Sequence, residues 1–273
     1  MKIEHIRAVF FSPTGGTKKV VTATASAIAD GMQLPCGSFD FTSWRERETE
    51  QVFSEMDLVV FGVPVIAGRV PNLLLPYLKE KIQGNGAYVV PMVSFGNRAY
   101  DEALKEIRNI LEEAGFRSIA AGGFISEHSF SETLGAGRPD EKDLVQLKEF
   151  GQAVVDKIKS GWEYERPIPL KDDGEVGAYF RPQGSGGAHI DMRKAKPETR
   201  ESCIRCGICA RACPLGSIQE ADPTTVTGIC MKCCACIKKC PIDAKYFADP
   251  GFIYHKEDLE QLYKRRAEPE WFV

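Results

Sequence analysis

Short apolar runs alternate with amphipathic segments through the first 160 residues of the chain. The runs are rich in β-branched and aromatic residues, as is typical of strands that are buried on both faces. They predict strands at residues 6–11, 38–41, 58–63, 87–94 and 118–125. Strands that alternate with helices in this way indicate an α/β domain built as a doubly wound parallel sheet.

Two of the amphipathic segments carry clear helix signals. Residues 100–114 repeat apolar positions at helical spacing above a charged face, and Gly115 supplies a C-terminal cap. A last helix should begin near Asp140, where Asp140 and Asp143 can accept hydrogen bonds from free N–H groups, and it should end near Gly161. It is expected to bury four apolar side chains, which are Leu144, Leu147, Phe150 and Val154.

Helical periodicity disappears after this point, and the chain divides into further segments. Residues 162–198 collect proline and glycine, which predicts a linker able to wrap over a neighbour, and we assign no function to it. Residues 199–250 contain an internal repeat, and residues 251–273 form a tail whose amphipathic run at 256–266 suggests a packing helix. The expected organisation is therefore a first domain at 1–161, the linker, a second domain at 199–250 and the tail.

Composition and charge narrow the range of functions. A length of 273 residues favours more than one domain, and the net charge of −3 is too small to argue for a nucleic-acid partner. The longest apolar stretch, residues 58–68, is far shorter than the roughly 20 residues that cross a bilayer, so we expect no membrane span. The N-terminus resembles a first strand and loop more than a signal peptide, which predicts a cytoplasmic protein.

The cysteines are distributed very unevenly. Nine of the ten lie between Cys203 and Cys240, and only Cys36 lies earlier. Disulfide scaffolds belong mainly to small secreted chains, so this clustering points to metal or redox chemistry. Residues 203–214 and 230–241 share the pattern C-x2-C-x2-C-x3-C-P at an offset of 27 residues. With that spacing, three thiolates of one loop bind three corners of a [4Fe-4S] cubane, and the fourth cysteine serves the other cluster.

This spacing predicts four ligands for each of two clusters. Cluster one would take Cys203, Cys206, Cys209 and Cys240, and cluster two would take Cys230, Cys233, Cys236 and Cys213. A zinc module and a structural, redox-silent cluster are the alternatives, although zinc-binding pairs are usually separated by a longer gap. Cys234 lies outside the spacing and is expected to be a bystander, and Cys36 is expected to be a small core or surface residue.

The loop after the first predicted strand has the composition of a phosphate-binding turn. It supplies hydroxyls, glycines and the start of a helix, and its candidate ligands are Ser12, Thr14, Gly15, Gly16 and Thr17. The loop lacks the Lys-Ser/Thr ending of a nucleoside-triphosphate site, and no G-x-G-x-x-G follows a strand, so a monophosphate fits better than ATP or a dinucleotide. A plain turn is the alternative.

Two later loops should reach the same crevice, because ligands of such sheets bind beyond the carboxyl ends of the strands. The loop after the third strand is mostly apolar and suits one face of a flat ring; its candidates are Pro64, Val65, Ile66, Ala67, Gly68 and Arg69. The loop after the fourth strand brings aromatic and hydrogen-bonding groups to the other face; its candidates are Ser94, Phe95, Gly96, Asn97, Arg98 and Tyr100. Core aromatics and solvated arginines are the alternative interpretation.

With these residues in place, residues 1–160 resemble a flavodoxin domain, and the whole chain resembles the flavodoxin/ferredoxin fusion proteins of anaerobes. The similarity extends to residues 95–101, 127–131 and 137–140. It implies a flavodoxin-like sheet of strand order 2-1-3-4-5, followed by a small α+β 2[4Fe-4S] ferredoxin domain, with FMN and two [4Fe-4S] clusters as cofactors. Gly16 stands where flavodoxins usually have asparagine, so the phosphate contact of that asparagine side chain is not expected here. His128 is a candidate proton donor near the flavin, with a surface or capping role as the alternative.

The combination predicts electron transfer between the clusters and FMN, with redox proteins as donor or acceptor. The alternatives are a flavin-dependent reductase of a small molecule and a non-enzymatic redox sensor. Within the flavin site, Gly68 would permit a backbone flip toward the flavin, and Arg69 or Arg98 would favour the anionic reduced flavin. A homodimer would be required if the clusters of one chain lie far from its own flavin.

Overall fold

A computed structural model describes residues 2–184 and 186–273, and its centre is a parallel sheet. The five parallel strands are β1 (His5–Phe10), β2 (Cys36–Asp40), β4 (Asp57–Pro64), β6 (Tyr88–Phe95) and β8 (Ala121–Ile125). They lie in the order β2-β1-β4-β6-β8. This is the flavodoxin-like order 2-1-3-4-5, so the predicted fold class is confirmed.

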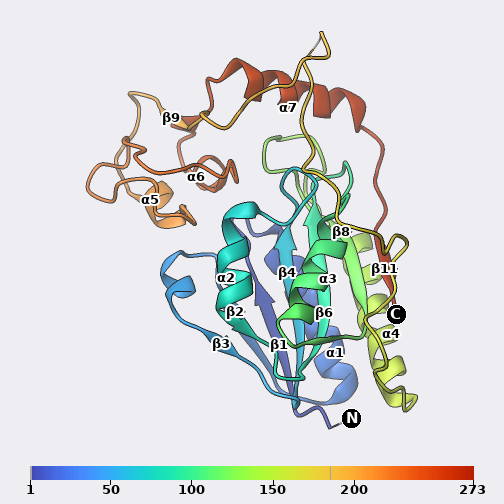
Figure 1. Cartoon of the computed structure of the whole chain (residues 1–273). Coiled ribbons are helices and arrows are strands. Elements are labelled where there is room, and N and C mark those ends of the chain that lie inside the picture. The colour runs from blue at the N-terminus through green and yellow to red at the C-terminus, as the bar shows by residue number, and fades with distance from the viewer. Residues whose placement is uncertain (1, 185) are drawn as a thin grey trace.

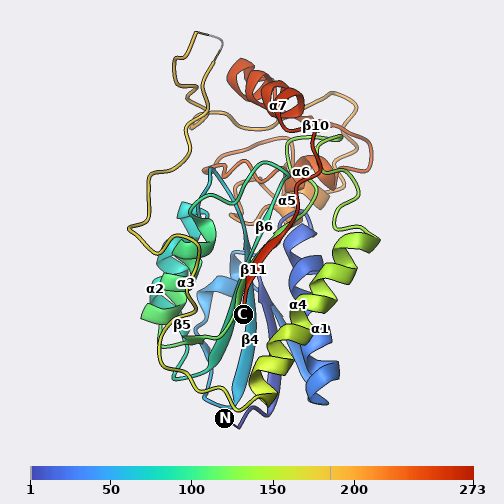
Figure 2. The ribbon, with the colours of Figure 1, turned by 90° about the vertical axis from the view of Figure 1, so that its right-hand side faces the viewer.

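Helices cover both faces of the sheet, as Figure 2 shows. Helices α1 (Gly16–Met32) and α4 (Glu141–Lys159) pack on one face, and α2 (Leu75–Glu80) and α3 (Ala103–Glu113) pack on the other. Short elements complete this unit: β3 (Gln51–Val52) pairs with β5 (Ile82–Gln83), β7 (Arg117–Ser118) pairs with β6, and 3-10 turns span Arg45–Glu48 and Asn72–Leu74. Burial on both faces explains why the strands are continuous apolar runs.

The N-terminus of α4 was predicted correctly, but one of its buried residues was not. Asp140 and Asp143 form a reciprocal capping box. Leu147, Phe150 and Val154 are buried as expected, whereas Leu144 is 44% exposed. Asp143 occupies the inward stripe four residues before Leu147, because its carboxylate pairs with buried Arg138. Leu144 therefore lies about 100° around the helix from that stripe and faces solvent.

The linker that follows α4 covers the charged face of α3. Lys105 pairs with Asp172 at 2.8 Å, and Arg108 donates to the carbonyl of Ile168 at 2.8 Å and pairs with Asp173. Both cationic side chains of α3 are consequently buried. The linker therefore packs on a face of α3 whose charged residues predict exposure to solvent.

The cysteine-rich unit lies over the carboxyl ends of the parallel strands (Figure 1). It contains α5 (Ile208–Ala212), α6 (Ala235–Lys238) and an antiparallel pair of β9 (Glu198–Thr199) with β10 (Lys245–Tyr246). Met231 of this unit is buried in the same apolar cluster as strand residues of the first unit. The two units are therefore in direct contact.

The tail returns to the first unit. Helix α7 (Pro250–Leu262) begins earlier than the predicted packing helix, with Asp249 as its cap. The chain then descends beside the sheet (Figure 2), and β11 (Glu270–Phe272) pairs antiparallel with β8 at the sheet edge. That strand was not expected from the sequence. No helix within residues 2–184 or 186–273 has the length and apolar character needed to cross a bilayer.

Candidate functional site

Two cavities in the cysteine-rich unit are each lined by four of the predicted ligands. One is lined by Cys203, Cys206, Cys209 and Cys240. The other is lined by Cys213, Cys230, Cys233 and Cys236, with the extra thiol Cys234. Each cavity thus combines three cysteines of one repeat with the last cysteine of the other. The residues present fit the cross-shared arrangement that the spacing predicts for two cubanes.

Backbone amides support the thiols in the same way in both repeats. The N–H groups of Arg205 and Lys232 donate to Cys203 and Cys230, each at 3.4 Å from nitrogen to sulfur. After the last cysteine of each repeat, N–H groups donate to Cys213 at 3.3 Å and to Cys240 at 3.2 Å. Such donors stabilise the thiolate, which is the form that binds iron.

Burial sets the protonation of the thiols when no metal holds them. It raises the pKa of Cys233 to about 12. Burial also raises the pKa of Cys240, but three backbone N–H donors outweigh it and the pKa is lowered. Within residues 2–184 and 186–273, no group of three or more His, Cys, Asp or Glu side chains has the arrangement to hold a single metal ion.

The two remaining cysteines have different surroundings. Cys234 is buried in an apolar cluster with Ala195, Phe247 and Phe252, and burial raises its thiol pKa well above the usual value. Cys36 is exposed on β2. Buried apolar surroundings make a thiol unreactive, so Cys234 acts as a packing residue beside the second cavity.

A third pocket is formed by the loops that follow β4, β6 and β8. Its lining includes most of the predicted ring-binding residues: Val65, Ile66, Ala67, Gly68, Phe95, Gly96, Arg98 and His128. Side chains from outside these three loops also line it and were not predicted, namely Phe180 from the linker, Lys232 from the cysteine-rich unit, and His255 and Leu259 from α7. We call it the loop pocket.

His128 is held in the loop pocket as a neutral ring. Its Nδ1 accepts the N–H of Phe130 at 3.1 Å. Burial, followed by the positive charges around it, lowers its pKa to about 4. The ring lies against the backbone of Gly96, where an added Cβ would be 2.3 Å from His128 Cδ2. His128 therefore presents an Nε2–H hydrogen-bond donor near neutral pH, rather than an acidic proton.

The two arginines predicted to influence the flavin differ in their surroundings. Arg69 makes two bonds to the Glu106 carboxylate, at 2.7 and 2.6 Å, and its guanidinium lies over Tyr179. Arg98 lines the loop pocket, where it pairs with Asp101 and lies 4.2 Å from the ring centroid of Phe180. Arg69 is thus engaged by α3, and Arg98 is the arginine that faces the pocket.

Asn97 and Tyr100 hold the tail instead of lining the pocket. The Asn97 amide donates to the carbonyls of Tyr263 and Arg265, each at 2.7 Å, and its oxygen accepts the N–H of Ala267 at 3.0 Å. The Tyr100 hydroxyl bonds to Glu270. The tail therefore engages both side chains, and neither residue is among those that line the loop pocket.

Gly68 is also constrained by its neighbours. Its carbonyl accepts the N–H of Glu102 at 3.0 Å, and an added Cβ would be 2.4 Å from the Asp101 carboxylate. The backbone flip expected at Gly68 would have to break that hydrogen bond. A glycine is required here for close packing as well as for its positive φ of 74°.

The predicted phosphate loop forms the N-terminus of α1. Ser12 accepts the N–H of Lys18 at 2.9 Å, and the hydroxyls of Thr17 and Ser94 lie 2.7 Å apart, close to the end of β4 at Pro64. Gly15 caps the helix without a side-chain bond, Thr14 is exposed, and the first turn carries no acid. A helix start of this kind offers unpaired N–H groups to an anion.

The structure explains the glycine that replaces the usual asparagine. An added Cβ at Gly16 would lie 2.7 Å from Ser126 Cβ. The loop after β8 therefore approaches this position too closely for any larger residue. None of the loop from Ser12 to Thr17 is among the residues that line the loop pocket.

The second cysteine cavity and the loop pocket share a segment of chain. Lys232 lines the loop pocket and lies between Cys230 and Cys233, which line the cavity. Its ammonium is fixed by the carbonyls of Arg193 and Cys230, at 2.9 and 2.8 Å. The neighbouring Met231 packs with the core of the first unit. The second cavity and the loop pocket of one chain are therefore neighbours along the segment from Cys230 to Cys233.

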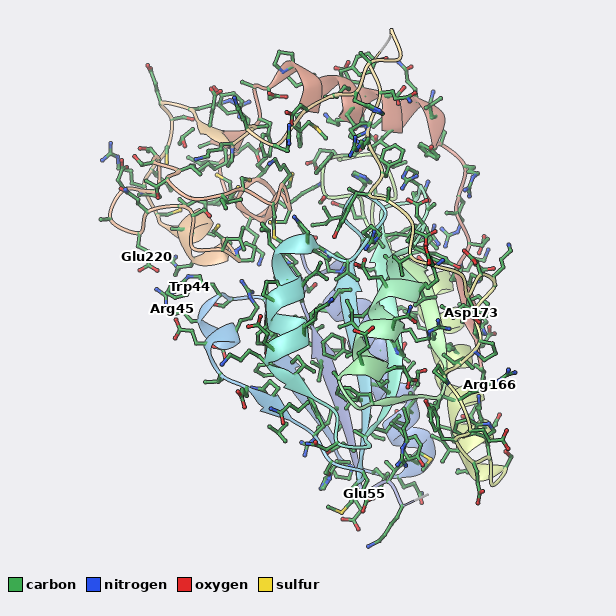
Figure 3. All side chains as sticks on the ribbon, in the orientation of Figure 1. Trp44, Arg45, Glu55, Arg166, Asp173 and Glu220 are labelled. Atoms are coloured by element: carbon green, nitrogen blue, oxygen red, sulfur yellow. The ribbon has the colours of Figure 1, made fainter. Side chains whose placement is uncertain are left out.

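Polar contacts fasten the two units around this junction. Lys238 pairs with Glu127 at 2.9 Å and with Glu132 at 3.0 Å. On the other side, Arg45 pairs with Glu220 at 2.7 Å, and Figure 3 shows the two side chains facing each other beside Trp44. Trp44 lies against Gly216, where an added Cβ would be 2.6 Å from the indole nitrogen.

Comparisons with known proteins found similarities to both units. A model described as a 4Fe-4S binding domain matches residues 199–219. A flavodoxin from the domain Archaea is 18% identical over 57% of this chain and 99% of its own, with a TM-score of 0.37. A Streptococcus pneumonia TIGR4 flavodoxin is 16% identical over 56% of this chain and 99% of its own, with a TM-score of 0.40.

Among curated proteins, no sequence matches this chain. The evidence for its architecture is the strand order of the sheet and the 4Fe-4S match in the cysteine-rich unit. The chain joins a flavodoxin-like unit to a 4Fe-4S ferredoxin unit.

Proposed function

We propose that this chain passes electrons between two [4Fe-4S] clusters and FMN and exchanges them with redox proteins. When bound, the clusters carry single electrons and the flavin takes up or releases two. The observation that carries the proposal is the position of Lys232, which lines the loop pocket while lying between two cysteines of the second cavity. An electron that passes from cluster two to the flavin would thus cross only the segment of chain that contains Lys232.

The cysteine cavities support an assignment of ligands. Cluster one is assigned to Cys203, Cys206, Cys209 and Cys240, and cluster two to Cys213, Cys230, Cys233 and Cys236. The repeated N–H donors to sulfur, two in each repeat, support it further. Cluster two would be the one next to the flavin.

The flavin is assigned to the loops at the carboxyl ends of the strands. Its phosphate would bind the N–H groups at the start of α1, and its ring would enter the loop pocket between the loops after β4 and β6. Arg98 would place a positive charge beside the ring and favour its anionic reduced form. Neutral His128 would donate a hydrogen bond from Nε2.

Cluster one would exchange electrons with the partner protein. Its cavity is bordered by Ile204 and Ile242, which are both exposed apolar side chains. Exposed apolar residues at the edge of a redox centre suit a transient protein contact. The proposed order of transfer is therefore partner, cluster one, cluster two and flavin, in either direction.

Anaerobic purification followed by iron, sulfide and flavin analysis tests the cofactor content. We expect about eight iron atoms and one FMN per chain, as two cubanes require. A content of eight iron atoms without flavin would support the two clusters but would refute electron transfer to FMN.

Cross-sharing of ligands has a separate test. Cys213→Ser should disturb the cluster held by the second repeat and spare the one held by the first, because Cys213 lines the second cavity. Electron paramagnetic resonance of the reduced protein would distinguish the two clusters, with Cys36→Ser as the exposed-cysteine control. Loss of the cluster held by Cys203, Cys206 and Cys209 instead would contradict the assignment.

Internal transfer within one chain is the remaining point. Because Lys232 joins the second cavity to the loop pocket of the same chain, the rate of flavin reduction by the clusters should not depend on protein concentration. Stopped-flow absorption at several dilutions, with sedimentation to determine the oligomeric state, measures this. A rate that falls on dilution would indicate transfer between chains.

A further inference from the structure

Lys245 is a buried cation in the cysteine-rich unit. Its exposed fraction is only 2%, and its ammonium donates to the Thr199 hydroxyl at 2.6 Å. None of the ion pairs among the described residues involves Lys245. An ammonium removed from water without an opposite charge is strongly unfavourable, so a counter-charge is expected from another source.

The neighbours of Lys245 identify that source. Lys245 lines the cavity of Cys203, Cys206, Cys209 and Cys240. Strand β10, which carries Lys245, contacts α6, which carries Cys236 of the second cavity. Cys236 and Cys209, one from each cavity, also pack in the same apolar cluster. Lys245 is therefore next to cysteines of both cavities.

The internal repeat shows that the fold does not demand a lysine here. The repeat offset of 27 residues places Ile218 at the position that corresponds to Lys245. Ile218 is 3% exposed, so both positions are buried. An apolar residue is the ordinary choice at such a site, and the lysine in the second repeat calls for a reason beyond packing.

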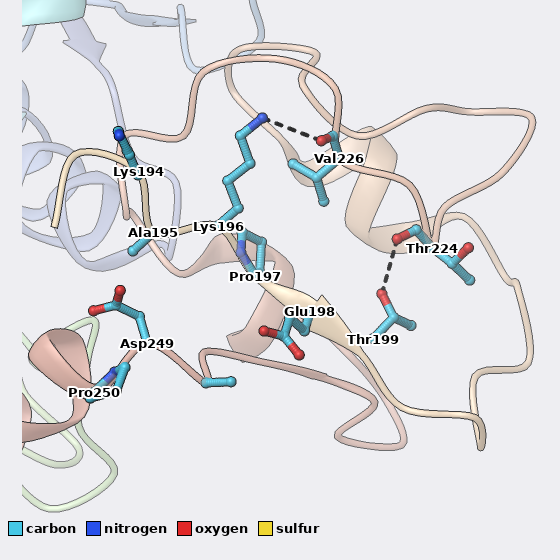
Figure 4. A pocket seen from close by; sticks show the side chains of 11 residues that line it. Lys194, Ala195, Lys196, Pro197, Glu198, Thr199, Thr224, Val226, Asp249 and Pro250 are labelled. Carbon is cyan, nitrogen blue, oxygen red and sulfur yellow. Dashed lines mark hydrogen bonds between the residues drawn. The ribbon is translucent and has the colours of Figure 1, made fainter.

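The ammonium is also held in a defined place. Lys245 of β10 is paired in register with Thr199 of β9. The Thr199 hydroxyl in turn donates to the carbonyl of Thr224 at 3.4 Å, a bond drawn in Figure 4. Thr199 is thus oriented to accept the lysine, which limits the freedom of the charge.

We propose that Lys245 is the shared counter-charge of the two clusters, and that it raises both reduction potentials so that the two clusters can be reduced together. The inference rests on the proposed function, since the clusters supply the negative charge. Each reduction adds one electron from an external reductant, a redox protein in the cell, and so adds one negative charge. A fixed cation in a poorly solvated site favours the reduced state of both clusters.

Potentiometric titration of the anaerobic holoprotein, followed by electron paramagnetic resonance, tests this. Dithionite serves as the reductant. Lys245→Met removes the charge at similar length, and Lys245→Ile copies the other repeat. Both variants should shift the two midpoint potentials to more negative values. The larger shift should reach at least about tenfold in the equilibrium constant for reduction, which is 59 mV for a one-electron couple.

Two control variants separate charge from other effects. Thr199→Val removes the hydrogen-bond acceptor but keeps the ammonium, and Lys239→Met removes an exposed charge next to Cys240. Thr199→Val should retain potentials close to those of the unaltered protein because the buried ammonium is still present. Lys239→Met should do the same because a solvated charge is screened. Shifts in Lys239→Met as large as those in Lys245→Met would overturn the proposal.

Iron content distinguishes a failure of the proposed function from a failure of the proposed role of Lys245. An unaltered protein without two cubane signals would refute the proposed function itself. Variants that carry eight iron atoms with unchanged potentials would refute only the role of Lys245. If Lys245→Met and Lys245→Ile fail to bind iron, Lys245→Arg decides. If Lys245→Arg binds eight iron atoms and keeps the potentials of the unaltered protein, a cation is needed at this position. If Lys245→Arg also fails to bind iron, Lys245 is a packing residue and the proposal is overturned.

Discussion

Arg138 should determine how firmly the tail is attached to the flavodoxin-like unit. Its guanidinium pairs with Asp143, and each side chain is only 4% exposed. The same guanidinium donates to the carbonyl of Ala267 at 2.7 Å, within the segment that descends from α7 to β11. We expect Arg138→Met to promote local opening of the tail while the parallel sheet stays folded.

The size of the effect follows from what the substitution leaves behind. Loss of one partner of a buried ion pair costs about 3–5 kcal/mol, because the other charge stays buried. Asp143 would keep Arg266 at 3.1 Å and the N–H of Asp140 at 2.9 Å, so the lower limit applies. A cost of about 3 kcal/mol increases the opening equilibrium by more than about a hundredfold.

Hydrogen exchange of the holoprotein measures this opening directly. The amides of β11 report the tail, and those of β1 report the sheet. Lys142→Met is the matched control, since Lys142 pairs with Glu268 of the same tail but the side chains are 59% and 50% exposed. Exposed pairs contribute less than about 1 kcal/mol, so this variant should change protection only slightly. Equal losses in the two variants, or a loss in β1 as large as in β11, would refute the reasoning.

Three further predictions concern the loop pocket. Gly96→Ala should weaken FMN binding by about tenfold or more while iron content is retained, because overpacking costs about 1–3 kcal/mol and the new Cβ would be 2.3 Å from His128. Fluorescence titration measures the affinity, and an unchanged value would contradict the position of His128. Arg98→Ala should make the flavin potential more negative, whereas Arg69→Ala should not, since Arg98 lines the loop pocket and Arg69 does not; equal shifts in spectroelectrochemistry would contradict this. Burial lowers the pKa of His128 to about 4 from 6.5, so the unfolded chain binds more protons between these values. Stability should therefore fall as pH decreases from 6.5 toward 4. Thermal unfolding of His128→Gln should show a weaker dependence, and an identical slope would exclude His128 as the cause.

The strands of the sheet could be predicted because their signals are local, whereas their order was expected from the resemblance to flavodoxins. Each buried parallel strand is a short apolar run, and Asp140 with Asp143 marks the start of α4 within four residues. Leu144 could not be placed from its apolar character, because Asp143 is drawn inward by an arginine of the preceding loop. Strand β11 was missed because a three-residue edge strand carries little periodicity and forms only where the tail reaches β8.

The candidate site likewise has parts that local sequence patterns predict and parts that they do not. Cysteine spacing predicted both cavity linings, since each loop must turn around its own cavity. Phe180, His255 and Leu259 enter the loop pocket from the linker and α7, and no local pattern places them there. Lys232 was not predicted, although its position between two assigned ligands means that it must lie near them. Asn97 resembled a ring-binding residue, but its partners are tail carbonyls about 166 residues away in sequence.

The linker and the tail give the proposed electron route its geometry. The chain leaves the flavodoxin-like unit through the linker, which is fixed to α3 by Lys105, and returns through the tail, which is fixed by Asn97. A unit attached at both ends, and fastened between them by Lys238, has little freedom to move away from the sheet. The second cavity and the loop pocket of the same chain consequently stay next to each other. Because electrons pass efficiently only between nearby centres, we interpret these covalent and polar attachments as what would keep the proposed clusters and the proposed flavin of one chain within reach of each other.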